Sequence, residues 1–311
     1  YVSGIAASAF EDCDNLTSVT MEIRRNVAEY RIGTKAFFDC DNLVNVVLPD
    51  DYYDGQKYYG ALAIETYAFA DCDKLLDVVF PQNATFVRIN DYAFQNCDSL
   101  ASVTLPSSVS DNINGYPTKS VFSDCDSLTT VVCESSIGRR WFTDCNNLKS
   151  VTISGSVGEY AFANIDSLTD VTLLEGVRDI GSNAFYDCDS LAEISIPKSV
   201  NSIYPNAFAH CNQLSRVTIS EGVSVIGEGA FSGCTALAAI SIPSSVTSIG
   251  ESAFSGCSGL TGSLTIPDSV TSIGYSAFFG CSGLTGSLTI PNSVTSIVGY
   301  AFYGCIGLTG S

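Results

Sequence analysis

The stretch SVTSIGESAFSGCSGLTGSLTIP, residues 245–267, contains the pattern that decides the fold. Phe254 is followed three positions later by Cys257 and six positions later by Leu260. A Phe with this downstream Leu recurs 13 times, at intervals of 20–32 residues. A period of this length indicates a solenoid, in which each unit buries its apolar face against its neighbours. The recurring residues are Phe10, Phe37, Phe69, Phe94, Phe122, Phe142, Phe162, Phe185, Phe208, Phe231, Phe254, Phe278 and Phe302.

Each repeat predicts three local structures. Apolar and polar residues alternate after the Leu, as in residues 214–219, which predicts a short strand with one buried face. A proline such as Pro197 often follows and would end the strand's hydrogen bonding. Next, Val-x-x-Ile-Gly in residues 246–250 predicts a second short extended segment. The small residue before Ala253 and Phe254 predicts one helical or 3-10 turn, with both side chains inward.

These three segments resemble the BspA-like leucine-rich repeat family, a class of bacterial and protist surface proteins. The resemblance rests on Leu-x-x-Val-x-Ile-Pro, Val-x-x-Ile-Gly and Ala-Phe-x-x-Cys and covers residues 1–311. It implies an α/β solenoid of about 13 units, curved and right-handed. The parallel β-sheet would line the concave face, with short helical or 3-10 turns and short strands on the convex side. The family also implies extracellular, cell-surface adhesion or host-protein binding, and it has no shared catalytic residues.

Composition excludes several classes of function. The 311 residues carry a net charge of −19, which disfavours nucleic acid and anionic membrane as partners. The single His makes His-based catalysis or a multi-His metal site improbable. No apolar run reaches the roughly 18 residues of a membrane helix. We therefore expect a protein that is not an enzyme, has no cofactor or metal, and does not insert into a membrane in this segment.

The repeats continue without a linker, so residues 1–311 are predicted to form one continuous domain. The chain begins with Tyr1 and stops inside a repeat, so we expect it to be a fragment of a longer chain. Its charge is uneven. Residues 1–205 carry 29 acidic and 13 basic side chains, against 4 and 1 in residues 206–311.

Twelve of the 13 cysteines occupy one equivalent position, and Cys133 occupies an inward strand position. We expect free, buried thiols, because a buried free cysteine behaves as a small apolar residue. Stacked parallel Cβ atoms are also poorly oriented for the disulfide dihedral angle. Disulfides and metal binding are the alternatives. Cys211 follows His210, but the neighbours of an inward cysteine point elsewhere, and no third group is evident that would orient a Cys–His catalytic dyad.

Aspartate flanks the cysteine on both sides in many of the early repeats. These residues predict two columns along one edge of the solenoid, with Asn96, Asn146, Asn164 and Asn212 in the same columns. The first interpretation is turn chemistry, which Asp and Asn share. The alternative is Ca²⁺ held between repeats. The paired aspartates are Asp12 and Asp14, Asp39 and Asp41, Asp71 and Asp73, Asp124 and Asp126, and Asp187 and Asp189.

Candidate ligand contacts lie on the outward side of the predicted sheet. Open sheet faces are the usual binding surface of solenoids. A column of β-branched residues can equally be explained by strand propensity alone. The candidates here are Thr152, Thr172, Glu193, Arg216 and Thr218.

Two long repeats carry insertions, and insertions in a solenoid map to loops. Residues 50–60 contain Tyr52, Tyr53, Tyr58 and Tyr59, and residues 110–119 contain Tyr116. Tyrosine is favoured at protein interfaces, so we predict binding there. The alternative is that these rings only hold the loops against the body. Asn15 and Asn83 fit the N-glycosylation pattern in a eukaryotic secretory source.

The sequence therefore predicts a cell-surface or secreted adhesion scaffold. It would recognise a host, neighbouring-cell or matrix protein through its concave face and its Tyr-rich loop. The alternative is a structural protein whose units stack end to end into a fibre or surface layer by self-association.

Overall fold

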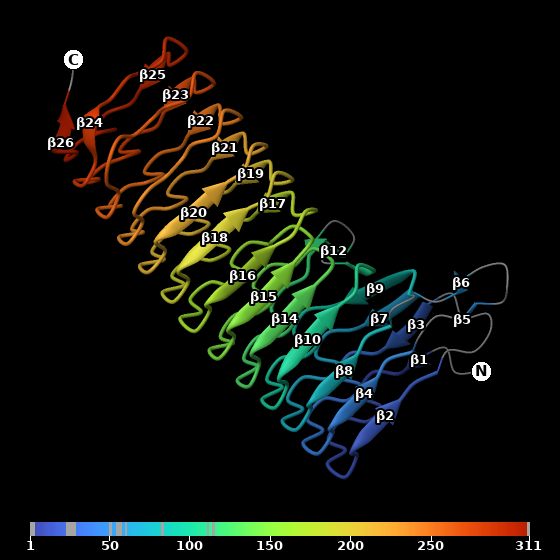
Figure 1. The fold of residues 1–311 in the computed structure, drawn as a ribbon. Helices are drawn as coiled ribbons and strands as arrows, with labels where there is room; N and C mark the ends of the chain where they lie inside the picture. The colour runs from blue at the N-terminus through green and yellow to red at the C-terminus, as the bar shows by residue number, and fades with distance from the viewer. Residues whose placement is uncertain are drawn as a thin grey trace. The chain divides into compact units, whose positions relative to one another are not determined.

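The structure is a computed structural model that describes residues 4–22, 29–49, 52–53, 58–59, 61–81, 84–110, 112–113 and 116–309. It consists of two compact units, Tyr1–Val151 and Thr152–Ser311, with the boundary inside strand β15 (Ser150–Ile153). Each unit is a stack of similar turns of a parallel-strand solenoid (Figure 1). Most full turns contribute one strand after the recurring Leu and one extended segment before the recurring Phe. After Leu237 and Leu260 the structure has only single bridge residues, Ala239 and Gly262.

In the first unit, the strands before the Phe form one continuous parallel sheet of five strands, with a register that aligns equivalent residues such as Ile32, Ile64 and Ile89. The strands after the Leu also pair in parallel. The first sheet consists of β1 (Gly4–Ile5), β3 (Glu29–Ile32), β7 (Ala61–Ile64), β9 (Phe86–Ile89) and β11 (Val109–Ser110). The others are β2 (Ser18–Thr20), β4 (Asn45–Val47) and β8 (Asp77–Val79), then β10 (Ser102–Leu105) paired with β14 (Thr130–Cys133).

The two insertions of the first unit each contain a small antiparallel hairpin. In the first hairpin β5 (Tyr52–Tyr53) pairs with β6 (Tyr58–Tyr59). In the second, β12 (Asn112–Ile113) pairs with β13 (Tyr116–Pro117). The insertions are therefore not featureless loops.

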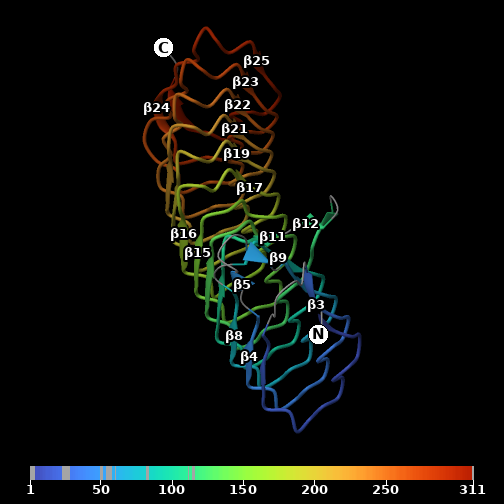
Figure 2. The same ribbon diagram turned by 90° about the vertical axis from the view of Figure 1, so that its right-hand side faces the viewer.

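In the second unit, the strands before the Phe form a continuous six-stranded parallel sheet, visible as parallel rungs in Figure 2. The strands after the Leu are less regular and fall into separate groups. The six-stranded sheet comprises β17 (Asp179–Ile180), β19 (Ser202–Ile203), β21 (Val225–Ile226), β22 (Ser248–Ile249), β23 (Ser272–Ile273) and β25 (Ser296–Ile297). The remaining strands are β16 (Asp170–Leu173), β18 (Glu193–Ile196), β20 (Arg216–Ile219), β24 (Thr285–Ser287) and β26 (Gly307–Thr309).

A column of stacked rings runs through the core of each unit. The recurring Phe side chains stack on those of the neighbouring turns, with ring centroids 5.0 Å apart between Phe10 and Phe37 and 5.4 Å apart between Phe231 and Phe254. From Phe37 to Phe278 these rings are at most 1% exposed. Buried aromatic side chains remove large apolar areas from water, so this column is a principal source of stability.

The expected helical turns, and with them the α/β class, were wrong: the described residues contain no helix, and thus none that could cross a membrane. The reason is backbone geometry. In every repeat the residues two before and two after the Phe have positive φ, as at Tyr67 (57°) and Asp71 (58°) around Phe69. A left-handed residue on each side of the Phe interrupts the run of right-handed residues that a helix needs. The segment is instead a chain of tight turns.

Candidate binding face

The outward side of the strands that follow the Leu is called the strand face. In the second unit it is clearest on β18 and β20, where Ile194 and Val217 are buried while Glu193 and Arg216 point outward. The two strands pair in register, with Glu193 opposite Arg216 and Ser195 opposite Thr218. The predicted alternation of buried and exposed residues is confirmed here.

The charged pair on this face is accessible. Glu193 Oε2 and Arg216 Nη1 are 3.2 Å apart, and the two side chains are 69% and 76% exposed. Exposed ion pairs contribute about 0–1 kcal/mol, so a partner could replace one of these contacts at little cost. The Asp170 carboxylate on the adjacent β16 accepts a hydrogen bond of 2.7 Å from Thr169 Oγ1.

A hollow of about 420 Å³ opens in the strand face beside this pair. β18 and β20 form a two-stranded sheet that does not include β16, and among the described residues no hydrogen bond joins β16 to β18. The structure thus brings four predicted contacts, Thr172, Glu193, Arg216 and Thr218, to one depression. The full lining is Val171, Thr172, Leu173, Glu193, Ile194, Ser195, Arg216 and Thr218.

Sequence reasoning missed this break in the sheet. A signal is present at the end of β16, where Leu174 stands in the place that Pro106 and Pro197 take in other repeats. Leu174 is 45% exposed. The opening itself depends on strand separation, which a sequence pattern does not report.

The other predicted contacts lie elsewhere. Thr152 is half-buried on β15 and does not line the hollow. Tyr52, Tyr53, Tyr58 and Tyr59 form the first hairpin, and Tyr116 belongs to the second, but their side chains lie outside the described part. Asn15 is exposed, and Asn83 falls outside the described residues.

The column of aspartates before the cysteines has a structural role that the geometry explains. These residues are the second left-handed position of each turn, with φ of 60° at Asp39 and 59° at Asp124. Asn and Asp tolerate this conformation better than other non-glycine residues, so the turn interpretation is confirmed for this column. In the described part of the chain, no three His, Cys, Asp or Glu side chains gather closely enough to hold a metal ion.

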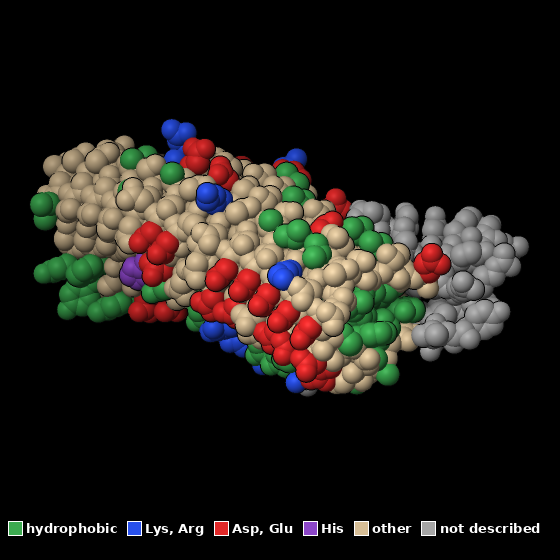
Figure 3. Space-filling model, turned by 90° about the horizontal axis from the view of Figure 1, so that it is seen from below, with side chains coloured by type: hydrophobic (Ala, Val, Ile, Leu, Met, Phe, Trp, Pro, Cys, Tyr) green, Lys and Arg blue, Asp and Glu red, His purple; other side chains and the backbone are tan. Residues whose placement is uncertain are grey.

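The acidic columns also create mutual repulsion. Figure 3 shows acidic side chains lying side by side in a row. Partial burial raises the pKa of Asp39, and the neighbouring carboxylates of Asp41, Asp12 and Asp71 raise it further. The pKa of Asp98 is raised for the same two reasons.

The cysteines form a ladder inside each unit. The Cys72 thiol donates to the Phe37 carbonyl at 3.1 Å, and the Cys257 thiol donates to the Phe231 carbonyl at 3.1 Å. Twelve of the 13 cysteines, Cys133 included, are buried, as expected, and Cys13 is half-buried. Burial raises the pKa of Cys257 to about 12, so this thiol is protonated and unreactive at neutral pH.

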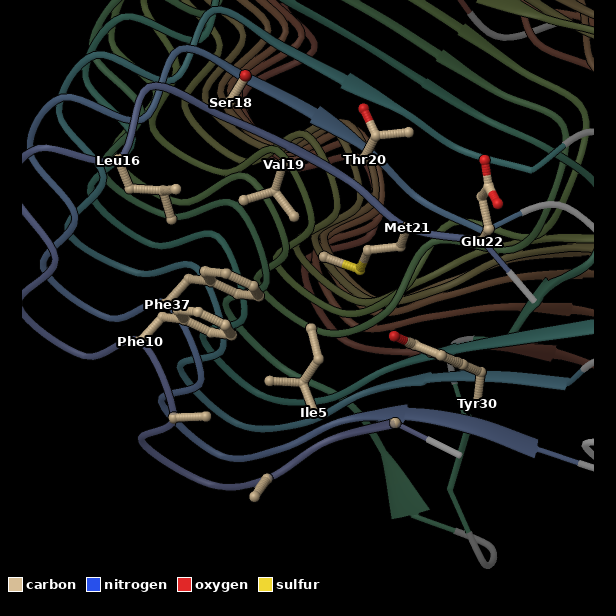
Figure 4. A pocket seen from close by; sticks show the side chains of 13 residues that line it. Ile5, Phe10, Leu16, Ser18, Val19, Thr20, Met21, Glu22, Tyr30 and Phe37 are labelled. Carbon is tan, nitrogen blue, oxygen red and sulfur yellow. The ribbon is translucent and has the colours of Figure 1, made fainter. Parts of the chain in front are cut away.

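A second opening of about 640 Å³ lies at the β1 end of the first unit. Figure 4 shows Ile5, Val19 and Met21 pointing into it, while Phe10 lies over Phe37. Phe10 is 41% exposed, whereas Phe37 is 1% exposed. Most of the side chains that line this opening, such as Ile5, Val19 and Phe10, are apolar, like those that pack between two turns inside the unit.

Comparisons with known proteins agree with this architecture. The model of the BspA type Leucine rich repeat region (6 copies) matches residues 2–59, 62–158, 135–261 and 261–310. A leucine-rich repeat protein from Bacteroides ovatus is 25% identical, with a TM-score of 0.60, over 97% of this chain and 80% of that one. A leucine rich cell surface protein from Faecalibacterium prausnitzii is also 25% identical, over 99% and 82% of the two chains, with a TM-score of 0.40. Among curated proteins, none matches this chain.

The family match covers nearly the whole chain and coincides with the repeats in which the Phe column, the thiol ladder and the two sheets are built. The chain therefore belongs to the BspA type leucine-rich repeat family.

Proposed function

We propose that this protein is a cell-surface or secreted scaffold that binds a partner protein through the strand face of its second unit. The observation that carries the proposal is the 420 Å³ hollow, which is lined by exposed polar side chains around an apolar base. Protein interfaces combine a depression that takes an anchoring side chain with a polar rim, and this arrangement is present here. Membership of a repeat-scaffold family supports a binding role over a catalytic one.

Electrostatics favour this region over the acidic edge of the first unit. Glu193 and Arg216 offer one charge of each sign to a partner and are already close together. Complementary charges at a rim increase the association rate and fix the orientation of a complex. A matrix or cell-surface protein with a mixed-charge patch is the kind of partner that fits.

The test is affinity for a captured matrix or cell-surface protein, measured by biolayer interferometry with wild-type chain and two variants. Arg216→Glu places two carboxylates together on the strand face and should weaken binding by about tenfold or more. Arg178→Glu is the matched control, because it makes the same charge change at an exposed residue that does not line the hollow. Equal loss in both variants, or none in either, would overturn the assignment of the face.

The Tyr hairpin of the first unit is proposed as a second contact area. Tyrosine supplies large contact area at low entropic cost, and the two paired strands of this hairpin consist of four tyrosines. Replacing Tyr52, Tyr53, Tyr58 and Tyr59 by Ala should weaken partner binding while leaving the unfolding midpoint in urea unchanged. Unaltered binding by this variant would remove the hairpin from the interface.

A second candidate function, end-to-end self-association, is favoured by the opening at the β1 end. Its apolar lining and the exposed Phe10 ring resemble the surface that one turn presents to the next. Solenoid stacking would extend both the ring column and the strand pairing between copies. Light scattering should then show mass rising with concentration, and Ile5→Lys should abolish the rise. A mass that stays monomeric at every concentration would exclude this function.

A further inference from the structure

The backbone hydrogen bonds that the recurring Phe and its two left-handed neighbours donate all run in one direction along the turns. The Phe278 N–H donates to the Ala301 carbonyl of the following turn at 2.7 Å, and the Gly280 N–H donates to the Tyr303 carbonyl at 2.8 Å. The left-handed residue before the Phe donates forward in the same way, and the direction is the same within both units. A turn therefore presents three N–H donors to the turn after it and three carbonyl acceptors to the turn before it.

This direction leaves opposite groups unpaired at the two outermost described turns. Residues 296–309 form the last of these turns, called the donor end, and residues 4–22, which carry most of the opening at β1, form the first, called the acceptor end. Among the described residues, the three forward N–H groups of the donor end have no acceptor, and the three matching carbonyls of the acceptor end have no donor. The donors belong to Tyr300, Phe302 and Gly304, and the acceptors belong to Ala7, Ala9 and Glu11. The two ends are therefore complementary in backbone hydrogen bonding.

The apolar side chains of the two ends match as well. Ile297 of the donor end is 46% exposed, whereas Ile273, its partner in register on the preceding turn, is fully buried. Ile5 occupies the same position of the repeat at the acceptor end and points into the opening (Figure 4). Phe10 and Phe302 are the outermost rings of their columns, and each stacks on one described neighbour only. A turn seated on either end would bury this apolar surface.

Two like ends do not match. Two donor ends would bring N–H groups against N–H groups, and two acceptor ends would bring carbonyls against carbonyls, so buried polar groups would stay unpaired. Two acceptor ends would also bring together the exposed carboxylates of Asp12 and Asp14, whereas residues 296–309 contain no charged side chain. A donor end against an acceptor end pairs the backbone groups and avoids this repulsion.

We propose that the acceptor end binds the donor end of a second copy of this chain, so that copies join head to tail. The Phe302 N–H of one copy donates to the Ala9 carbonyl of the next copy, and Ile297 packs on Ile5 of that copy. Such a contact is heterologous and repeats from copy to copy instead of closing after two. This inference rests on the self-association put forward under Proposed function, and it specifies which surfaces meet and in which direction.

The experiment measures mass by light scattering for the wild-type chain and for two variants that each block one end. The wild-type mass should rise with concentration beyond that of a dimer. Ile5→Lys and Ile297→Lys each place a charge in one apolar end, so each variant alone should stay at the mass of one chain. An equimolar mixture should reach twice that mass and stop, because each variant supplies the end that the other lacks. Val225→Lys is the control, since it changes an aliphatic residue that is 38% exposed on an interior turn, and it should grow like the wild type.

The variants separate this inference from self-association as such. Dimers of Ile5→Lys alone would mean that donor ends pair with each other, and dimers of Ile297→Lys alone would mean that acceptor ends do. Either result, or a mixture that stays monomeric, would overturn head-to-tail joining while the self-association of the wild type stands. A wild-type mass that stays at one chain at every concentration would overturn both. Circular dichroism checks that the variants are folded.

Amide hydrogen exchange of the wild-type chain gives a second readout, which remains decisive if a variant does not fold. The amides of Tyr300, Phe302 and Gly304 should exchange about tenfold more slowly when about nine in ten ends are occupied, because only free ends exchange. The Phe278 amide already donates to the following turn, so its exchange should not depend on concentration. Unchanged exchange at the three donor-end amides while the mass rises would overturn the proposal.

Discussion

The first unit and the last four repeats of the second unit build the same turn from different residues. The left-handed position after the Phe is Asp or Asn in the first unit, as at Asp39 and Asp124, but Gly at 233, 256, 280 and 304. The backbone angles are similar, at 60° for Asp39 and 74° for Gly256. The difference shows that this position requires a residue that tolerates positive φ, which Asp, Asn and Gly all do. Part of the acidic charge of the first unit therefore follows from the use of Asp, where the last four repeats use Gly.

The strongest test of this comparison is the shared core. Phe94→Ala in the first unit and Phe254→Ala in the second should each lower the free energy of unfolding by about 3–5 kcal/mol, because both rings are fully buried between two stacked neighbours. Urea unfolding followed by far-UV circular dichroism gives the values. A loss below about 1 kcal/mol in one region alone would show that the two regions do not share one core design.

The second test concerns backbone conformation. At Gly256 an added Cβ would meet its nearest neighbour, Gly233 Cα, at 3.8 Å, so space is available and the φ of 74° is the only obstacle. Gly256→Ala should therefore destabilise the protein by about 1–2 kcal/mol. Ser258→Ala, at an exposed site two residues away, should have almost no effect. A harmless Gly256→Ala would mean that the left-handed turn relaxes without cost.

The third test removes charge and keeps the turn. Asp39→Asn preserves the tolerance of positive φ and removes the repulsion from Asp12, Asp41 and Asp71. Two charges about 5 Å apart repel by roughly 0.8 kcal/mol in water, so the variant should gain up to that amount at low ionic strength. In about 1 M salt the gain should disappear through screening. A gain that persists in high salt would point to something other than charge.

The smallest expected effect is the response to pH. The pKa values of Asp39 and Asp98 are raised above the usual 3.8 in the folded state, so the folded chain binds protons at a higher pH than the unfolded chain. The contribution of these groups to stability therefore increases as pH falls through their folded pKa values. The pKa of Glu221 is lowered, chiefly by the Ser244 N–H, so its contribution falls as its carboxylate is protonated at lower pH.

This pH response can be measured region by region. Trp141 is the sole tryptophan and lies in the first unit, so its fluorescence reports that unit. The urea midpoint of unfolding that Trp141 fluorescence reports should rise slightly when the pH is lowered from about 7 to about 4.5. Far-UV circular dichroism should show a smaller change for the chain as a whole. A fall in the Trp141 midpoint over this range would contradict the repulsion argument.

Much of the fold was predictable because the same pattern of apolar residues recurs in every repeat. Burial of Phe254, Cys257 and Leu260 followed from their spacing, and the strand alternation followed from residues such as 214–219. The helical turn was wrong, because the first left-handed position is taken by Lys35, Tyr67 or Asn206, which share no chemical signal. The second position could have been recognised from its Asp, Asn and Gly residues.

The candidate site was predictable in its residues and not in its shape. Thr172, Glu193, Arg216 and Thr218 follow from the outward positions of a strand pattern. The hollow between β16 and β18 arises where two neighbouring strands fail to pair, and strand separation is a property of packing in three dimensions.

The thiol ladder gives twelve of the 13 repeats an internal reporter, since the repeat of Phe162 has Ile165 in place of the cysteine. Because a buried thiol with a raised pKa, such as that of Cys257, resists alkylation until its turn opens, labelling of such a cysteine at a given urea concentration shows that its turn has opened. Mass spectrometry of the labelled chain would identify which ones opened first. The labelling pattern would therefore give the order in which the cysteine-containing turns unfold.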